Sequence, residues 1–432
     1  MTSPLPPVVV LGLNYPPEPT GISPYTGALA AGLAARGHET RALTTHPHYP
    51  DWRIRAGYGQ WSRNENIDHV AVERLLHYVP RQPRRISRLL SEVSFGLRLA
   101  LRSWGRPGAV VAVSPALFSS AIAYASARLR YRSVPFIVWV QDLYSQGLAE
   151  FDGRESAGVR LARVVERWLL GRADRVVVIH DRFVPRVRDD LGVSADRISV
   201  IRNWTHLPPI PEVDVAAARA GFGWSEGEKV VLHCGNMGVK QGLENVIEAA
   251  RLAAQRGEHV RFVLVGDGSE RARLQKLGAG IPTLQFLPPL DSQDFPAALR
   301  AADVLLVNER PGVSEMAVPS KLTSYFSAGR PVLAATDPLG ITAEEVRAAG
   351  AGVAVQSGAP DVLLDAAIAL VADPERAAAY GESAQRYRET VLDADFAIDR
   401  FATLVSTLAS AAPAAAAVGP ATQEPPMPAL PA

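Results

Sequence analysis

Short runs of aliphatic residues alternate with longer amphipathic stretches along most of this 432-residue chain. The runs are apolar at every position, as in 8–11 and 109–113, which is typical of strands buried on both faces of a parallel sheet. The stretches between them repeat apolar residues at helical spacing. We therefore predict an α/β protein in which helices separate parallel strands. Further strands are expected at 39–43, 136–140, 175–179, 198–201, 230–233, 261–265, 283–286, 304–307, 331–334 and 352–355.

The pattern forms two series that meet at a proline-rich stretch, 207–213. Prolines there prevent both helix and central strand, so we predict a linker between two domains, 1–206 and 207–395. Each domain is expected to be a doubly wound, Rossmann-like unit, and the two to face each other across a cleft. A last periodic segment, about 396–408, is a candidate to pack back on the first domain. The Ala- and Pro-rich tail, 411–432, is predicted to be disordered.

Composition narrows the class of partner. A net charge of +1 supplies no global field for nucleic acid, so we expect no nucleic-acid partner. The single cysteine, Cys234, fits a reducing compartment. The chain begins almost directly with a strand and contains no run of 18 uncharged apolar residues. We expect a cytoplasmic protein whose contact with a membrane, if any, is peripheral at the inner face of the plasma membrane.

The segment Leu232-His-Cys-Gly-Asn-Met-Gly-Val-Lys-Gln-Gly-Leu243 carries the clearest chemistry. A buried-type strand ends in a glycine-rich loop, Lys240 follows, and a helix begins after it. Backbone amides, a helix N-terminus and an ammonium together suit a diphosphate. The loop is not a Walker loop, because neither Ser nor Thr follows the lysine. The alternative is a strand–helix turn whose lysine is only solvated.

Other strand ends carry weaker signals of the same kind. The loop 12–21 lacks the Gly-x-Gly-x-x-Gly spacing of NAD-binding folds, yet Gly21 and Ile22 place backbone amides near a helix start. This loop could instead be an ordinary surface loop. Gly266 lies in a tight turn after a strand. Ser320 is a good N-cap and Lys321 follows it, so their helix offers a second anion-facing end.

The ordered set of these motifs resembles family 4 retaining glycosyltransferases of the two-Rossmann GT-B type. It is similar, more narrowly, to bacterial enzymes of colanic-acid and exopolysaccharide biosynthesis. The resemblance runs from about Val8 to Leu408. The motifs that carry it are Gly235-x4-Lys240-x-Gly242, Val265-Gly-Asp-Gly268, Val318-Pro-Ser-Lys321 and Ala328-Gly-Arg-Pro331, with Pro16-Pro17 to Gly21 and Leu33 to His38.

The resemblance implies a sugar transfer from a UDP- or GDP-sugar to a hydroxyl of a saccharide or lipid-linked saccharide. No metal or other cofactor is expected. Lys240 would hold the donor diphosphate in the loop that contains Gly235 and Asn236. Amides of Gly21 and Ile22 would approach the phosphate or the transferred sugar. Nucleotide contacts are expected from a further set of positions, Gly266, Ser320 and Lys321.

Two departures from the family pattern keep other functions open. Asn236 stands where the family usually has arginine, and Met316 and Ser324 occupy the positions of its paired glutamates. Glu315 and Glu309 lie close by in sequence. An epimerase of the same fold, which needs no acceptor, is one alternative. A non-catalytic sugar-nucleotide-binding partner is another, and the missing carboxylates are the feature that keeps it open.

Acceptor chemistry is expected in the first domain. Asp142 follows a strand and is our candidate for the carboxylate that meets the acceptor hydroxyl. Gln141 stands where many family members have histidine. A second cluster, His46, His48, Asp51 and Trp52, offers aromatic faces to sugars. Structural roles are more common for such loop histidines than catalysis, and the same holds for His180.

The segment 81–106 contains seven arginines and one acid. Its apolar residues recur at helical spacing, and its arginines form a separate stripe that includes Arg84, Arg88, Arg98 and Arg102. Such a helix suits an anionic membrane surface or a lipid diphosphate. The apolar stripe could equally be core. The stripe consists of Ile86, Leu90, Val93, Leu97, Ala100, Leu101 and Trp104.

Overall fold

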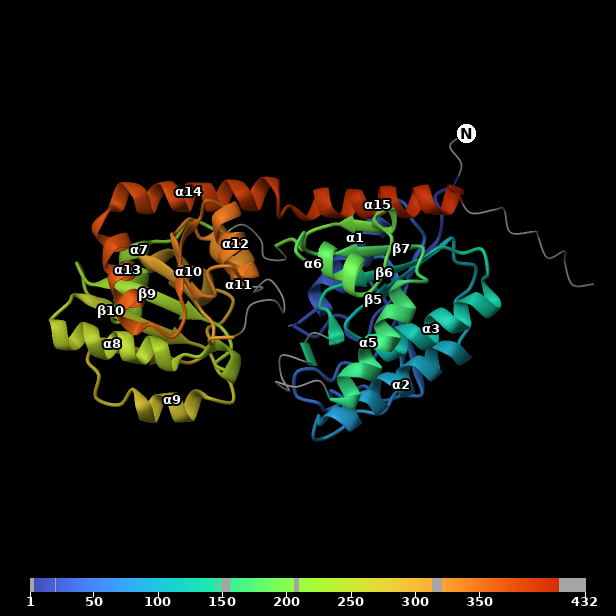
Figure 1. Ribbon diagram of the computed structural model, residues 1–432, viewed down its shortest axis with the longest axis horizontal. Coiled ribbons are helices and arrows are strands. Elements are labelled where there is room, and N and C mark those ends of the chain that lie inside the picture. Colours follow the sequence, from blue (N-terminus) through green and yellow to red (C-terminus); the bar gives the residue numbers. More distant parts are fainter. Residues whose placement is uncertain are drawn as a thin grey trace, which may run out of the picture.

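The computed structural model describes residues 4–19, 21–145, 147–148, 156–205, 210–312 and 321–411. Within these ranges the chain forms two α/β units that lie side by side (Figure 1). The N-terminal unit contains a sheet of strand order β3-β4-β2-β1-β5-β6-β7-β8, and the C-terminal unit one of order β11-β10-β9-β12-β13-β14. The predicted two-domain fold of Rossmann-like units is confirmed.

In the N-terminal unit the strands are β1 (Val8–Leu11), β2 (Thr40–Thr45), β3 (Ser62–Ile67), β4 (Val70–Leu75), β5 (Ala109–Val113), β6 (Phe136–Val140), β7 (Arg175–Val178) and β8 (Ile198–Val200). The helices are α1 (Ser23–Ala35), α2 (Arg85–Leu101), α3 (Leu117–Arg130), α5 (Ala157–Leu170), α6 (Phe183–Pro185), η1 (Arg186–Asp190) and η2 (Ala195–Arg197).

In the C-terminal unit the strands are β9 (Lys229–Cys234), β10 (Val260–Val265), β11 (Leu284–Leu287), β12 (Val304–Asn308), β13 (Val332–Thr336) and β14 (Gly352–Gln356). The helices are α7 (Val215–Gly221), η3 (Val239–Gln241), α8 (Glu244–Arg256), α9 (Arg271–Leu277), α10 (Asp294–Ala301), α11 (Lys321–Ser327), α12 (Ile341–Ala348), α13 (Pro360–Ala372), α14 (Pro374–Thr390) and α15 (Ala394–Ala411).

The continuous apolar runs are explained by burial on both faces of each sheet. In β9, Val230 and Leu232 belong to one hydrophobic cluster, whereas Val231, between them, belongs to another. Successive side chains of a strand point to opposite faces, so helices on both sides require every position to be apolar. The predicted strands are all present, with ends that differ by at most two residues.

Strands β3 and β4 were not predicted. They form an antiparallel pair joined at Asp68 and His69, which both have positive φ, and β4 pairs with β2. Sequence patterning missed β4 because Glu73 and Arg74 interrupt its apolar run, although both are buried. Each buried charge has a partner: Arg41 ion-pairs with Glu73, and Glu65 with Arg74.

Strand order reverses at β1/β5 in the first sheet and at β9/β12 in the second. Loops after these strands therefore diverge and leave a crevice at the carboxyl ends, which is where ligands bind in such folds. The loops that carry Gly21, Asp142 and Lys240 all leave carboxyl ends of strands.

Helices α14 and α15 run along both units on one side of the molecule (Figure 1). Helix α15 packs on the N-terminal unit, where Ile398 contacts Gly32 and the Phe401 ring lies 5.0 Å from that of Trp139. Residues 207–209 of the predicted linker and 412–432 of the predicted tail lie outside the described residues, so the domain boundaries and the disordered tail stay predictions.

A buried polar joint connects the two units. Glu345 of α12 accepts hydrogen bonds from Arg202 at 2.5 Å, from Tyr387 at 3.0 Å and from Nε2 of His180 at 3.2 Å. The backbone amide of Arg182 donates to Nδ1 of His180, which leaves Nε2 to carry the proton. Burial alone would raise the pKa of Glu345, but these donors outweigh it and the pKa is lowered. His180 thus has a structural role, as predicted.

Candidate functional site

A cavity of about 980 Å³ is lined by residues of both units. Lys240 comes from the C-terminal unit, and Asp142 and Ile22 come from the N-terminal unit. The structure thus brings together three residues that sequence reasoning singled out. Most of the remaining lining is apolar, including Leu89, Phe118 and Leu148.

Residues at and just after the end of β12 hold the loop that carries Lys240. Asn308, at the end of β12, donates to the carbonyls of Gln241 at 2.7 Å and Gly242 at 3.0 Å. The amide of Arg310 donates to the carbonyl of Lys240 at 2.8 Å. These bonds leave the lysine side chain exposed on the short helix η3. Sequence reasoning missed Asn308, although a polar residue that ends an apolar strand is a usable signal.

Glycines let two strand-end loops meet in the C-terminal unit. A Cβ on Gly266, whose φ is +132°, would lie 2.0 Å from the carbonyl oxygen of Gly235. No side chain fits there, so the close approach requires glycine. Gly235 also has a positive φ, +143°, and lies against the ammonium of Lys321. Asn236 is exposed beside them.

Lys321 begins helix α11 and is half-buried at this loop. Its ammonium lies 3.4 Å from Nε2 of His233. Burial lowers the pKa of Lys321 to about 8, while nearby Cys234 and Glu309 act in the opposite direction. Thr342 donates to Glu309 at 2.7 Å, and Thr336 donates to it as well. Glu309 therefore places a carboxylate close to Lys321.

Part of the predicted nucleotide site cannot be compared. Ser320, Met316 and Glu315 lie outside the described residues. Ser324 is buried inside α11, so it offers no hydroxyl to the cavity. Gly235, Asn236, Gly266 and Lys321 lie near one another, but none of them is among the described residues that line the cavity.

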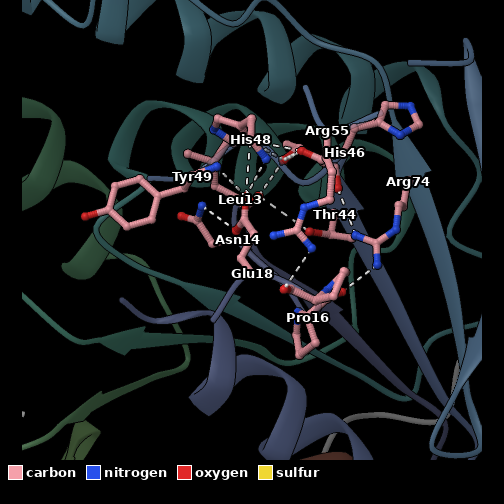
Figure 2. Close-up of polar contacts among 12 residues, drawn as sticks. Leu13, Asn14, Pro16, Glu18, Thr44, His46, His48, Tyr49, Arg55 and Arg74 are labelled. Atoms are coloured by element: carbon pink, nitrogen blue, oxygen red, sulfur yellow. Dashed lines mark hydrogen bonds and ion pairs between the residues drawn. The ribbon is translucent and has the colours of Figure 1, made fainter. Parts of the chain in front are cut away.

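The opposite loop, 12–21, is held by buried side chains (Figure 2). Glu18 accepts hydrogen bonds from the amides of His48 at 2.7 Å and Tyr49 at 2.8 Å, and from Asn14 at 2.8 Å. Arg74 donates to the carbonyl of Pro16 at 2.5 Å. This cluster ties the loops after β1 and β2 together. Sequence reasoning did not identify it, because the partners of Glu18 and Arg74 come from segments that are separate in the sequence.

The fixed loop positions Gly21 and Ile22. Gly21 has a φ of +70° and is exposed beside the ring of Tyr49, and Ile22 precedes helix α1 and lines the cavity. The predicted amide positions therefore lie at the edge of the cavity. Trp52, in the neighbouring loop, also lines it and has a φ of +52°.

Asp142 follows β6 and lines the cavity. Burial raises its pKa to about 7, although the charge of Lys240 acts to lower it. The turn after it is held by Glu166, which accepts from the amides of Tyr144 at 2.7 Å and Ser145 at 3.2 Å. Gln141 is buried and accepts a bond of 2.6 Å from Asn203. A carboxyl group with a pKa near 7 can exchange a proton at neutral pH.

The two loop histidines have structural partners. His46 contacts the carbonyl of Gln60 at 2.7 Å, and Nδ1 of His48 contacts the carbonyl of His46 at 3.0 Å. Asp51 is exposed nearby. Within the described parts of the chain, no group of three or more His, Cys, Asp or Glu side chains could hold a metal ion.

Helix α2 exposes most of the apolar stripe that was predicted. The exposed fractions are 74% for Ile86, 52% for Leu90, 52% for Leu97 and 85% for Leu101. The core interpretation is therefore wrong for these four, whereas it holds for Trp104, which is 1% exposed. Among the helices that the structure describes, none has the length and apolar character needed to cross a membrane.

The arginines of the α2 stripe fall into two groups: Arg98 and Arg102 contact other parts of the unit, whereas Arg84 and Arg88 line the cavity. Arg98 donates to the carbonyl of Trp61 at 2.6 Å and lies 3.5 Å from the centre of its ring. Arg102 ion-pairs with Glu73. Arg84 and Arg88 line the cavity, and Arg88 lies 5.2 Å from the centre of the Trp52 ring.

Comparison with known proteins identifies the family of the chain and shows that its fold occurs in solved structures. Residues 20–204 match the family model described as a glycosyl transferase 4-like domain, and residues 214–387 match glycosyl transferases group 1. The chain is 35% identical to the colanic acid biosynthesis glycosyl transferase WcaI of Escherichia coli K12 over 338 residues, 74% of this chain and 81% of that protein.

Two solved structures show the same fold. Sucrose-phosphate synthase of Thermosynechococcus elongatus has a TM-score of 0.71 at 20% identity and covers 94% of this chain and 100% of its own. HepE of Anabaena, in complex with UDP-glucose, has a TM-score of 0.67 at 18% identity and covers 93% and 100%.

Proposed function

Because the chain belongs to the group 1, family 4-like glycosyltransferases of GT-B fold, of colanic-acid and exopolysaccharide type, we propose the division of labour within its reaction. The C-terminal unit binds a nucleoside-diphosphate sugar, and the N-terminal unit binds the acceptor. The sugar passes to an acceptor hydroxyl with retention of configuration. One observation carries this proposal: Lys240 and Asp142, from opposite units, line a single cavity.

On the donor side we propose that Lys240 and Lys321 hold the diphosphate, together with the amides near Gly235 and Gly21. Departure of the nucleoside diphosphate builds negative charge on the leaving oxygen. Fixed ammonium groups and amides lower the energy of that charge more in the transition state than in the ground state. They supply the electrostatic stabilisation without a metal ion. The UDP-glucose bound by HepE supports a donor of this class, and a GDP-sugar fits the same diphosphate contacts.

In this proposal Glu309 supplies a carboxylate near Lys321, as a substitute for one of the missing glutamates. Its carboxylate faces Lys321 and is fixed by two threonines, Thr336 and Thr342. Ser324 is buried and cannot bind ribose as a glutamate would. The ribose is then held by backbone and by residues near the start of α11, among which Ser320 is the candidate from sequence.

On the acceptor side we propose that Asp142 accepts a hydrogen bond from the attacking hydroxyl. The departing phosphate lies on the same face of the sugar and can take the proton, so no covalent intermediate with the protein is required. The acceptor is a saccharide, and the mainly apolar remainder of the cavity fits a lipid-linked one. Exposed Leu97 and Leu101, with the arginines of α2, would hold the enzyme at the anionic inner face of the plasma membrane.

The experiment that tests the donor site is calorimetric titration with UDP-glucose and GDP-mannose. The Lys240→Ala variant should bind its preferred donor about 10- to 100-fold more weakly, since a hydrogen bond to a charged group contributes roughly 1.5–3 kcal/mol. Lys276→Ala removes an exposed charge of α9 and should change nothing. Equal affinities in wild type and Lys240→Ala would overturn the role of Lys240.

Membrane attachment is tested separately by co-sedimentation with phosphatidylglycerol vesicles. Leu97→Glu/Leu101→Glu places two anions on the exposed face of α2 and should abolish binding. Leu339→Glu, at a position 77% exposed in the C-terminal unit, is the matched control. Vesicle binding that survives the double substitution would exclude this face of the helix.

A further inference from the structure

We infer that an arginine-lined groove at the outer end of the cavity binds the diphosphate that joins sugar to lipid in the acceptor. The inference rests on the proposed transfer to a lipid-linked saccharide. The groove lies between the loop after β2, which carries Arg53 and Ile54, and the loop before α2, which carries Val79 and Arg81. We call it the arginine groove.

Adjoining hollows make this groove continuous with the cavity. Arg81 lines three hollows at the surface, of about 940, 580 and 520 Å³. The second shares Trp52 with the cavity, and the first shares Arg84 and Ile86 with it. A molecule that extends from Asp142 can therefore pass Trp52 and reach Arg81 without leaving the protein surface.

The charges of the groove are not used by the fold. Arg53, Arg81 and Arg84 are exposed, and among the described residues none of them forms an ion pair. By contrast, Arg36, Arg74 and Arg128 of the same unit each pair with a carboxylate. These other arginines pair because acids lie within reach, whereas the groove leaves its guanidinium groups to a ligand.

Other charges near the arginine groove are those of Arg55, Asp51 and the N-terminus of helix α2. Arg55 lies in the third hollow and donates a weak hydrogen bond of 3.5 Å to the carbonyl of Pro17. Asp51 also lines this hollow, but it makes no ion pair with the arginines among the described residues. Helix α2 begins at Arg85 with no acid in its first turn, so the positive end of its dipole adds to the field.

The order of chemistry along this path matches one class of molecule. Lys240 and Asp142 lie at the inner end, Trp52 and Arg88 follow, and the arginine groove comes next. Exposed apolar residues, Tyr78, Ile86 and Leu90, line the first hollow, which also contains Arg81 and Arg84. A saccharide, a diphosphate and a hydrocarbon chain, joined in that order, would meet complementary surfaces throughout.

A diphosphate suits the groove better than a single headgroup phosphate. Guanidinium groups bind phosphate oxygens in pairs through planar, two-pronged hydrogen bonds. Arg53 and Arg81 come from different loops and line the same hollow, and Arg84 lines the next one. Two phosphates on adjacent positions can engage both hollows at once, whereas one phosphate cannot.

The test uses farnesyl diphosphate, farnesyl monophosphate and inorganic pyrophosphate as probes, with affinity measured by calorimetry on the full chain. Wild type should bind farnesyl diphosphate at least tenfold more tightly than the monophosphate. Arg53→Gln/Arg81→Gln should weaken diphosphate binding at least tenfold and leave the melting temperature unchanged, because both side chains are exposed. Inorganic pyrophosphate, which lacks the apolar chain, should bind more weakly but show the same loss.

Three controls separate the sources of binding. Arg132→Gln/Arg386→Gln removes two exposed charges elsewhere and should leave all affinities unchanged. Lys240→Ala should still bind farnesyl diphosphate, which shows that the probe does not occupy the donor site. UDP-glucose or GDP-mannose affinity should be unchanged in the groove variant.

The outcomes are distinguishable. Unaltered farnesyl diphosphate binding in Arg53→Gln/Arg81→Gln overturns the inference. Equal affinity for monophosphate and diphosphate, with loss of phosphatidylglycerol vesicle binding in the same variant, overturns it too and assigns the groove to membrane headgroups. If neither sugar nucleotide binds the wild type, the proposed function fails, while the groove is still judged by the prenyl probes alone.

Discussion

The two loops that face each other across the cavity are held in place by different means. In the C-terminal unit the contact is backbone against backbone, with Gly266 pressed on the carbonyl of Gly235. In the N-terminal unit the contact is made by buried side chains, with Glu18 joining the loops after β1 and β2. The loop around Gly235 and Gly266, which we propose to hold the donor, therefore tolerates no added atom. Loop 12–21, in the unit that we propose to bind the acceptor, depends on a polar network that can be altered by degrees.

This difference matches what each side must recognise. A diphosphate is the same in every sugar nucleotide, so a donor loop without freedom has no disadvantage. Acceptors differ between enzymes, and a loop held by side chains can change shape through single substitutions. Substitutions on the two sides should accordingly have effects of different size and kind.

The largest effect is expected for Gly266→Ala. The new Cβ would collide with Gly235, and the positive φ adds strain, so the free energy of unfolding should fall by about 4 kcal/mol. Gly257→Ala is the matched control, since its φ is +70° and nothing lies within 4 Å of a Cβ there. It should cost about 1 kcal/mol. Urea denaturation of both variants measures the difference, and equal losses would remove the steric argument.

Glu345→Gln tests the buried polar joint between the two units. It should have the second-largest effect and lower the free energy of unfolding by about 3 kcal/mol, because it breaks a buried ion pair with Arg202. The pKa of Glu345 is lowered from 4.5, so its contribution to stability is complete above that value and is lost as pH falls through the lower folded-state pKa. The variant should therefore lose its deficit relative to wild type in acid. A deficit that stays constant down to pH 2 would contradict this account.

Asp142→Asn should lower kcat/KM about 100-fold at neutral pH, a loss of roughly 2.7 kcal/mol. In wild type, activity should rise with pH through the Asp142 pKa of about 7, because the ionised carboxylate is the better acceptor for the hydrogen bond of the attacking hydroxyl. The variant should lack this rise. Lys240→Ala should move it to higher pH, since the Lys240 charge lowers the pKa of Asp142. A pH profile unaffected by Asp142→Asn would leave the carboxylate without a role in binding the attacking hydroxyl.

The smallest effect is expected for Glu18→Gln. The amide side chain keeps one oxygen for His48 and Tyr49 but turns a donor toward Asn14, so stability should fall by about 2 kcal/mol. The loop lies in the proposed acceptor unit and also carries Gly21, which we propose to approach the donor phosphate, so the Michaelis constants for both substrates should rise. Glu39→Gln, at an exposed position, should alter neither constant. Unchanged Michaelis constants in Glu18→Gln would show that this loop contributes to neither site.

Most of the fold could be predicted from the sequence, because burial on both faces of a sheet leaves runs that are apolar throughout. β3 and β4 escaped prediction, since Glu73 and Arg74 are paired with partners distant in sequence. A single amino-acid sequence does not show which charged residues will be buried in ion pairs. The same limit applies to Glu18, whose donors lie about 30 residues along the chain.

The candidate site was predictable in part. Lys240 and Asp142 follow strands, and a doubly wound topology brings the carboxyl ends of strands to one edge of each sheet, so each residue was expected at the ligand-binding edge of its own unit. Their meeting also requires that the two edges face each other, as the shared cavity shows. The exposure of the α2 stripe does not, because periodicity shows that Ile86 and Leu97 share a face without showing what covers it. The arginine groove joins Arg53 and Arg81 from separate loops, and no spacing rule relates them.

The return of helix α15 to the N-terminal unit bears on how the protein is made. During synthesis the first sheet emerges before the residues that pack on it, Ile398 and Phe401, because α15 follows the whole second sheet in the chain. The surface of the N-terminal unit that α15 covers therefore stays exposed to solvent while the second sheet is translated. Chaperone dependence during translation should therefore fall when a detached α15 peptide is supplied early.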